Sequence, residues 1–326
     1  MSVKHQVTAV LSTLGEPMVF VDVGASGQPP REWSSIRANA TYVGFDPDRR
    51  EVSNKANGSD GHLIVLNKAV TADGMAKSAH FFFTKNPYCS STCRPNSIKL
   101  KEYLFYPRFE VIGEGEVETM TLETAMAEVG LHRIDWLKLD TQGTDLRIYD
   151  SLTPQLRNTV LIADIEPGLD EYYVGEDVFT KVHSRLLQEG YWLSDLSVGG
   201  AAKVRSESLS IPGKRGVRHL VYEQTLKRNP TYVNARYFRS IEFLGATNVS
   251  CEQLIYTWAA AMVTGNSGFA LDIAELYSQR FPTCPRASIL RRIAFRAVRS
   301  TVVLRCYRLL KHLSLNKLRR LVKGTY

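Results

Sequence analysis

The sequence is poor in cysteine and has no long apolar run. Its five cysteines are irregularly spaced, and Cys89 and Cys93 have no second pair, which argues against a zinc site and a disulfide framework. The most apolar segment, residues 254–274, is interrupted by Gly265 and Gly268, so we expect no membrane-spanning helix. The N-terminus lacks the apolar core of a secretory signal peptide. These features predict a cytoplasmic protein with reduced thiols.

Several common enzyme motifs are also missing. The sequence has no GxSxG, HExxH or GxxxxGK[ST] segment, and its seven histidines are scattered. Hydrolases with a nucleophile elbow, zinc proteases and P-loop nucleotidases are therefore disfavoured. The hydrophobic content of 44% and the charged content of 23% are those of a folded globular protein.

The charge is unevenly distributed along the chain. The formal net charge is +8, but residues 285–326 hold 12 Lys and Arg and no acidic residue, which leaves residues 1–284 with a net charge of −4. Helical periodicity puts the arginines of this tail on one side and most of its apolar residues on the other, although two apolar residues break the pattern. The arginines are Arg292, Arg296 and Arg299, the apolar side is Ile289, Leu290, Ile293, Ala297 and Leu304, and the exceptions are Phe295 and Val302.

Such a tail suits two roles. An amphipathic basic helix can lie on an anionic membrane surface, here through residues 286–323, at the inner face of a membrane. It can also pack on the rest of the protein through its leucines and valines. Nucleic acid is a less favoured partner, because no RNA-binding motif accompanies the basic residues.

Short apolar runs alternate with helical patterns between residues 17 and 225. This alternation predicts an α/β fold with a doubly wound, mostly parallel sheet. The expected strands are Met18–Val23, Tyr42–Phe45, Leu63–Leu66, Ala79–Phe83, Ile134–Leu139, Val160–Ile165, Tyr191–Leu193 and Val217–Tyr222. We expect an N-terminal helix over 1–16, the α/β domain over 17–225, a helical extension over 226–284 and a basic amphipathic tail over 285–326.

A glycine-containing loop follows the first expected strand. It reads Asp22, Val23, Gly24, Ala25, Ser26 and Gly27, and Pro29 and Pro30 come next. Glycines allow a backbone to approach a ligand closely, but prolines remove the N–H donors that a pyrophosphate needs at a helix start. The loop therefore favours a nucleoside without phosphates, such as S-adenosyl-L-methionine, over NAD.

The next two strands end in polar residues suited to a nucleoside. Asp46 lies 22 residues beyond Gly24, where a carboxylate can accept hydrogen bonds from both ribose hydroxyls. A turn aspartate before Pro47 is the structural alternative. After the third strand, Asn67 and Ala69 are candidates to border the adenine.

Acidic residues gather at the ends of two later strands. Period-two alternation puts Trp136, Lys138 and Asp140 on one face of the strand expected at 134–139. It puts Ile162, Asp164 and Glu166 on one face of the strand expected at 160–165. The three carboxylates are then aimed at the same edge, where they could serve as a general base, bind a divalent metal or bind a polyol. A structural ion-pair network with Lys138 and nearby arginines is the alternative.

These segments resemble those of FkbM-type methyltransferases. The stretch IDWLKLDTQGTDLRIYDSL is similar to the family's hallmark, with Lys138, Asp140, Gly143 and Asp145 at its matching positions. VFVDVGASG, YVGFDPD, NPYCSSTCRPN and the stretch from IADIEPG to GYWLSDL are similar to further family segments in the same order. The resemblance covers about residues 17–225. Pro29 and Pro30 are unusual for it, and residues from 226 onward lie outside its core.

The resemblance implies a class I methyltransferase that uses S-adenosyl-L-methionine. Family members methylate a hydroxyl of a sugar or another natural product, so we expect a glycan or small-molecule acceptor. We predict Asp140 as the general base, with Glu166 or Asp164 assisting and Lys138 beside them. Two other functions stay open: an RNA- or membrane-binding protein with a non-catalytic sheet, and an RNA methyltransferase steered by the tail.

Overall fold

The computed structural model describes residues 2–26, 30–48, 50, 62–101, 103–205, 207–209 and 217–323. The chain divides into two compact units. We call residues 14–249 the sheet unit, and residues 1–13 with 250–326 the helical unit. Gly27 and Pro29 of the predicted cofactor loop lie outside the described residues.

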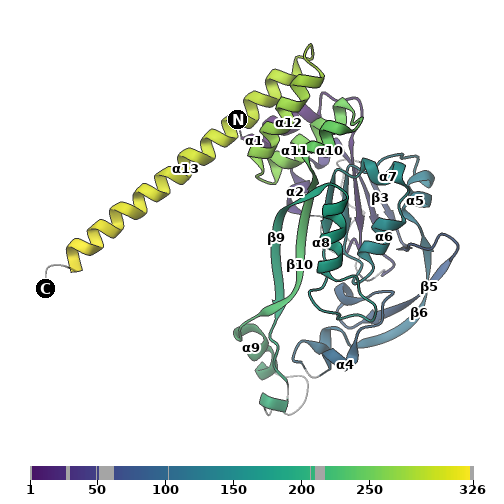
Figure 1. Ribbon diagram of the computed structural model, residues 1–326. Coiled ribbons are helices and arrows are strands. Elements are labelled where there is room, and N and C mark those ends of the chain that lie inside the picture. Colours follow the sequence, from purple (N-terminus) through teal and green to yellow (C-terminus); the bar gives the residue numbers. More distant parts are fainter. Residues whose placement is uncertain are drawn as a thin grey trace. The chain divides into compact units, whose positions relative to one another are not determined.

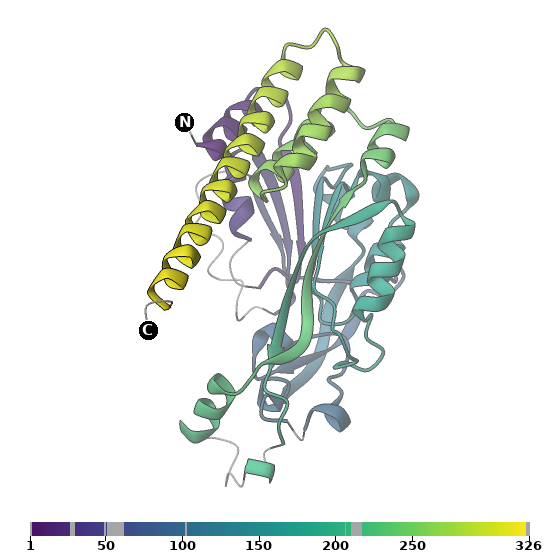
Figure 2. The same ribbon diagram turned by 60° about the vertical axis from the view of Figure 1, so that its left-hand side comes forward.

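The described part of the sheet unit contains a seven-stranded sheet (Figure 1 and Figure 2). Strands β3, β2, β1, β7 and β8 are parallel neighbours, whereas β10 is antiparallel to both β8 and the edge strand β9. In spatial order the strands are β3 (His62–Leu66), β2 (Ala40–Phe45), β1 (Met18–Val23), β7 (Trp136–Leu139), β8 (Ile162–Ile165), β10 (Asn229–Arg239) and β9 (Tyr191–Ala201). This arrangement confirms the predicted α/β fold with a mostly parallel sheet.

Four helices cover one face of this sheet, and their apolar side chains form its largest core (Figure 1). They are α5 (Leu122–Glu128), α6 (Asp145–Ser151), α7 (Pro154–Thr159) and α8 (Phe179–Gln188). On the opposite face Trp33 of the short helix α2 (Arg31–Ser34) stacks on Phe20 of β1, with ring centroids 4.3 Å apart. The buried central strands fit the apolar runs from which they were predicted.

A smaller sheet borders the main one. Among the described residues it has three strands in the order β4 (Ala69–Val70), β6 (Val111–Met120) and β5 (Ser78–Thr84). The other helices in the described part of the sheet unit are α4 (Ser97–Leu100), α9 (Val217–Thr225) and α10 (Ile241–Ala246), with 3-10 turns η1 (Arg37–Asn39), η2 (Pro87–Cys89), η3 (Tyr106–Arg108) and η4 (Glu207–Leu209).

Two predicted elements are wrong. Residues Val217–Tyr222, expected as a strand, belong to helix α9, because Val217, Leu220 and Val221 have helical spacing. The extension 226–284, expected to be helical, begins with strand β10. Its side chains alternate between buried and exposed along Thr231–Ala235, which is the period-two pattern of a strand.

The helical unit consists, in its described part, of four helices. They are α1 (Val3–Leu11), α11 (Cys251–Val263), α12 (Ser267–Arg280) and α13 (Arg286–Lys323). Helix α11 begins with a capping box in which Ser250 and Gln253 each bond the other's backbone. Helix α13 packs on α12 and on α1, and it continues without a break through most of the basic tail.

Candidate functional site

A pocket lies at the carboxyl ends of β1, β2 and β7, the edge where ligands bind in open α/β sheets. We call it the first pocket. Five of the predicted site residues line it, namely Gly24, Ser26, Asp46, Ala69 and Asp140. Its other walls include residues that follow the same strands and residues of the segment 87–92.

Gly24 turns the chain at the end of β1. Its φ of +81° is in the left-handed region, and a Cβ there would lie 1.9 Å from the carbonyl oxygen of Asp140. The N–H groups of Gly24 and Ala25 both donate to the carbonyl of Phe45, at 3.0 and 2.9 Å. Only glycine therefore allows the ends of β1, β2 and β7 to approach this closely.

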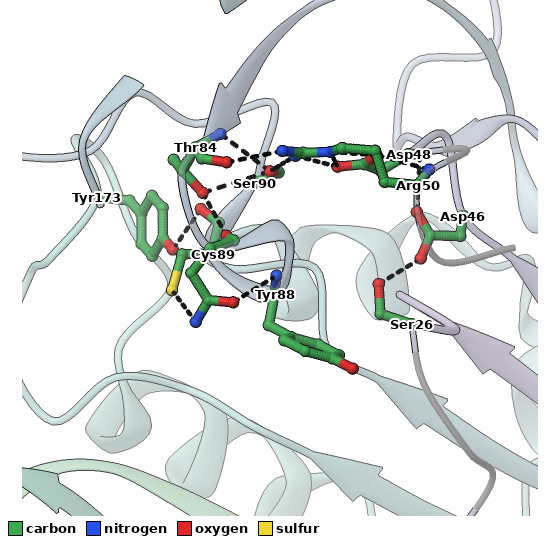
Figure 3. Close-up of polar contacts among 10 residues, drawn as sticks. Ser26, Asp46, Asp48, Arg50, Thr84, Tyr88, Cys89, Ser90 and Tyr173 are labelled. Carbon is green, nitrogen blue, oxygen red and sulfur yellow. Dashed lines mark hydrogen bonds and ion pairs between the residues drawn. The ribbon is translucent and has the colours of Figure 1, made fainter. Parts of the chain in front are cut away.

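Asp46 is held at the end of β2, and its residue is 4% exposed. Its carboxylate accepts hydrogen bonds from the hydroxyl of Ser26 and from the backbone N–H of Asp48, the latter at 2.8 Å (Figure 3). Asn67 does not line the first pocket; its amide donates to the backbone carbonyl of Asp46. Asn67 thus helps to fix the backbone at Asp46 without lining the pocket.

An ion pair that the sequence did not reveal fixes one wall of the first pocket. The Arg50 guanidinium donates to both carboxylate oxygens of Asp48, and also to the carbonyl of Thr84 and the hydroxyl of Ser90, both at 3.1 Å (Figure 3). Asp48 and Ser90 both line the pocket. The only available signal was the Asp-Pro-Asp run after the second strand, which does not identify the contact of Arg50 with Ser90, 40 residues further along the chain.

Lys138 links the carboxylates of two neighbouring strands. Its ammonium lies 3.1 Å from Oδ1 of Asp22 and 3.5 Å from Oδ2 of Asp140. Burial alone would lower the pKa of Lys138, but the attraction of Asp22 and Asp140 outweighs it and raises that pKa above its usual value. Lys138 therefore stays charged and provides a fixed positive charge beneath the site.

Asp22 is part of this buried network rather than of the pocket wall. Its second oxygen accepts a hydrogen bond from the Tyr42 hydroxyl at 2.7 Å, and the residue is 3% exposed. Ala25, also predicted to bind cofactor, is buried and is absent from the described wall of the first pocket. Both residues are therefore buried near the start of the loop that follows β1 and do not line the first pocket.

Gln142 positions the side chain of Asp140. Its amide donates to Oδ1 of Asp140 at 2.7 Å, and its oxygen lies 3.0 Å from the hydroxyl of Tyr173. The backbone of Gln142 has a φ of 59°, which is unusual for a residue other than glycine, and the Ser91 hydroxyl donates to its carbonyl at 2.9 Å. Sequence reasoning missed Gln142 because neither its backbone conformation nor its distant partners can be inferred from local spacing.

A second pocket adjoins the first, and the two share Tyr88 and Gln142. Aromatic side chains are frequent in its wall, beside two arginines and Glu166. The aromatic residues are Tyr88, Phe105, Phe109, Tyr172, Tyr173 and Tyr232, and the arginines are Arg108 and Arg228. A lining of aromatic rings with a few polar groups is typical of a site for a ring-shaped polar ligand.

Glu166 reaches the second pocket from the end of β8. The pairing of Leu139 with Ile165 makes Asp140 and Glu166 neighbours at the two strand ends, as the sequence predicted. Burial and the nearby carboxylate of Asp140 raise the pKa of Glu166 to about 9, although Lys138 counteracts this. Glu166 therefore keeps its proton at neutral pH, next to the carboxylate of Asp140.

Asp164 is engaged elsewhere. Arg236 of β10 donates to both of its oxygens, at 2.7 and 2.9 Å, and the indole N–H of Trp136 donates to it at 3.0 Å. Asp164 lines neither of the two pockets described above. This bidentate pair corresponds to the ion-pair network that we considered as an alternative.

Among the described residues, no group of three or more His, Cys, Asp and Glu side chains is placed to hold a metal ion. In the same part of the chain, no helix is both long enough and apolar enough to cross a membrane.

No protein-family model and no curated protein matches the sequence. Several solved structures are distantly similar to it in fold, including the following two. One is a candidate methyltransferase from Thermoplasma acidophilum, with 8% identity, a TM-score of 0.27 and coverage of 69% of each chain. The other is an antibiotic-related methyltransferase, with 9% identity, a TM-score of 0.27 and coverage of 73% of this chain and 94% of that one. The similarity to methyltransferases is distant, and it concerns the fold alone.

Proposed function

We propose that this protein is an S-adenosyl-L-methionine-dependent O-methyltransferase related to the FkbM type. Its acceptor would be a hydroxyl of a sugar, a glycan or another natural product. The observation that carries this proposal is the pair of adjoining pockets at the carboxyl edge of the sheet. One pocket has the residues for a nucleoside, the other has aromatic walls and a protonatable carboxylate, and Tyr88 and Gln142 belong to both.

The residues of the first pocket fit the cofactor chemically. Asp46 presents a carboxylate, which accepts hydrogen bonds from ribose hydroxyls. Ala69, Val70 and Phe81 provide apolar surface for an adenine ring. Asp140 adds a negative charge toward a cationic ligand. When bound, S-adenosyl-L-methionine supplies a methyl group on a positively charged sulfur.

The fit to a dinucleotide is poorer. Pro30 is the N-cap of α2 and brings no N–H donor to the start of that helix, and α2 is only four residues long. A pyrophosphate is usually bound by several free backbone N–H groups at the N-terminus of a longer helix. These features support a nucleoside sulfonium over NAD.

The second pocket suits a carbohydrate or a similar ring. Aromatic faces such as those of Phe109 and Tyr232 pack against the C–H face of a sugar, while Glu166 and the two arginines can bind its hydroxyls. The pocket adjoins the first one through Gln142, so an acceptor there would lie next to the reacting methyl group.

The Asp140 and Glu166 pair would take the proton of the acceptor. The acceptor oxygen would form a bond to the methyl carbon while the carbon–sulfur bond breaks. The electron pair of the carbon–sulfur bond would stay on sulfur. The hydroxyl proton passes to the pair and then to solvent. Gln142 and Lys138 orient Asp140 for this role, and the aromatic side chains of the second pocket would limit contact of the acceptor with water.

The test is transfer of a radiolabelled methyl group from S-adenosyl-L-methionine to a panel of sugars, lipid-linked glycans and transfer RNA. We expect label on a carbohydrate hydroxyl, and a kcat that falls by at least about a hundredfold in Asp140→Asn, the scale of a lost general base. Asp164→Asn is the matched control and should retain turnover. Near wild-type turnover by Asp140→Asn, with cofactor affinity unchanged, would remove Asp140 from the mechanism. Label on RNA alone would overturn the acceptor assignment.

A further inference from the structure

Helix α13 has two apolar stripes on different sides, and they have different surroundings. The first stripe is buried inside the helical unit, where α13 packs on α12 and α1. It consists of Leu290, Ile293, Ala294 and Ala297, which are all less than 10% exposed. This stripe contains most of the side that the sequence identified, and it explains how the helix is anchored.

The second stripe is exposed. Phe295, Val302 and Val303 are 56%, 54% and 59% exposed. At 100° per residue Val302 lies about 20° from Phe295 around the helix, whereas Leu290 and Ala297 lie about 140–160° away from it. Phe295 and Val302 were the residues that broke the expected pattern. The structure shows that they belong to a separate face.

Arginines lie between these exposed apolar side chains. Arg292, Arg296 and Arg299 are all exposed, and no acidic side chain among the described residues forms an ion pair with them. Arg291, in contrast, is paired with Glu275 of α12. The exposed face therefore combines uncompensated positive charge with bare apolar surface.

The same pattern continues along the sequence of the helix. Residues 304–323 contain seven Lys and Arg and no acidic residue. Leu309 and Leu313 follow Val302 at intervals of seven and four residues, which is helical spacing. An apolar groove between α1 and α13 adjoins the exposed face, and Arg292 and Arg296 line it together with Ala9, Val10, Ile289 and Ile293.

We propose that this exposed face of α13 binds the surface of an anionic lipid bilayer. The arginines would meet lipid phosphates, and Phe295, Val302 and Val303 would enter the boundary between headgroups and acyl chains. A nucleic acid would use the charges but would leave these apolar side chains without a partner. The charge and the apolar residues together thus favour a membrane.

Flotation of the full-length protein with vesicles tests this inference. We expect binding to vesicles of phosphatidylcholine with phosphatidylglycerol, much weaker binding to phosphatidylcholine alone, and partial release by salt. The triple variant Phe295→Ser, Val302→Ser, Val303→Ser should lose at least about tenfold in binding, as should Arg292→Gln, Arg296→Gln, Arg299→Gln. All six side chains are exposed, so circular dichroism should show both variants folded.

Matched controls use exposed residues of the sheet unit. Met75→Ser, Ile98→Ser, Ile112→Ser removes three apolar side chains that are at least as exposed, and Lys77→Gln, Lys101→Gln, Lys181→Gln removes three positive charges. Both controls should float like the wild type. Equal flotation of the triple serine variant of α13 and the wild type would overturn the proposal. Two other results would also overturn it: a dimer in light scattering that the triple serine variant abolishes, or RNA binding without vesicle binding. None of these readouts depends on methyl transfer.

Discussion

The backbone of Gly24 at the end of β1 approaches Asp140 at the end of β7 so closely that a Cβ on residue 24 would lie 1.9 Å from the Asp140 carbonyl oxygen. Gly24 belongs to the loop proposed to hold the cofactor, and Asp140 is the proposed base. The two functions therefore depend on one packed contact between neighbouring strands.

Replacing Gly24 with alanine should disrupt both functions. The added Cβ has to displace backbone atoms, and it also meets an unfavourable positive φ, so we expect a loss of about 2–4 kcal/mol in the free energy of unfolding. Gly130→Ala is the matched control, because Gly130 has a φ of +70° and open space at its Cβ position. Urea unfolding of both variants measures the difference. Equal losses would show that the contact with Asp140 does not constrain residue 24.

Asp46 should contribute to binding of the cofactor rather than to turnover. Removing a carboxylate that accepts hydrogen bonds from ribose should cost about 1–3 kcal/mol, or about 5- to 150-fold in the Kd of S-adenosyl-L-methionine. Titration calorimetry of Asp46→Ala measures this, with Asp73→Ala as the control on an exposed loop. An unchanged Kd for Asp46→Ala would mean that Asp46 does not bind the ribose of the cofactor.

The raised pKa of Glu166 makes a prediction about pH. The folded chain holds a proton on Glu166 up to about pH 9, whereas the unfolded chain releases it near the usual value of 4.5. The contribution of this group to stability is therefore complete below about pH 4.5 and is lost as the pH rises through about 9. Glu166→Gln should thus gain about 1–3 kcal/mol over the wild type at pH 8.5 and little at pH 4.5.

Urea unfolding at several pH values tests this expectation. The stability of Glu166→Gln relative to the wild type should increase with pH. A difference that stays constant across the range would mean that Glu166 ionises normally. In activity measurements, kcat/KM of the wild type should change as the pH passes about 9, because Glu166 then loses its proton and adds a second negative charge beside Asp140.

Asp164 should be structural. Removing its charge leaves the half-buried Arg236 without its bidentate partner, which should cost about 2–4 kcal/mol of stability. We expect Asp164→Asn to bind S-adenosyl-L-methionine with a Kd within about twofold of wild type. Thermal unfolding and calorimetry on the same sample separate the two effects. If Asp164→Asn is as stable as the wild type but loses turnover, Asp164 takes part in catalysis and its role is not only structural.

The alternation of short apolar runs with helical patterns was sufficient to predict the centre of this fold. Strands β1, β2, β7 and β8 are short, apolar and buried on both faces, so their positions follow from composition, and the parallel arrangement makes their carboxyl ends meet. The adjacency of Asp140 and Glu166 could be predicted for this reason.

The partners of these residues could not be predicted, because they come from distant segments. Arg236, which pairs with Asp164, lies on β10. This strand was not recognised in the sequence because Asn229, Pro230 and Asn234 are uncommon in strands. Gln142 adopts its left-handed backbone through contacts with Ser91 and Tyr173, which local periodicity does not encode.

The most direct test of the account is a calorimetric titration of the wild-type protein with S-adenosyl-L-methionine, S-adenosylhomocysteine and NAD. We expect micromolar binding of both sulfur compounds and no binding of NAD. Absence of binding for both sulfur compounds, in a protein that circular dichroism shows to be folded, would contradict it.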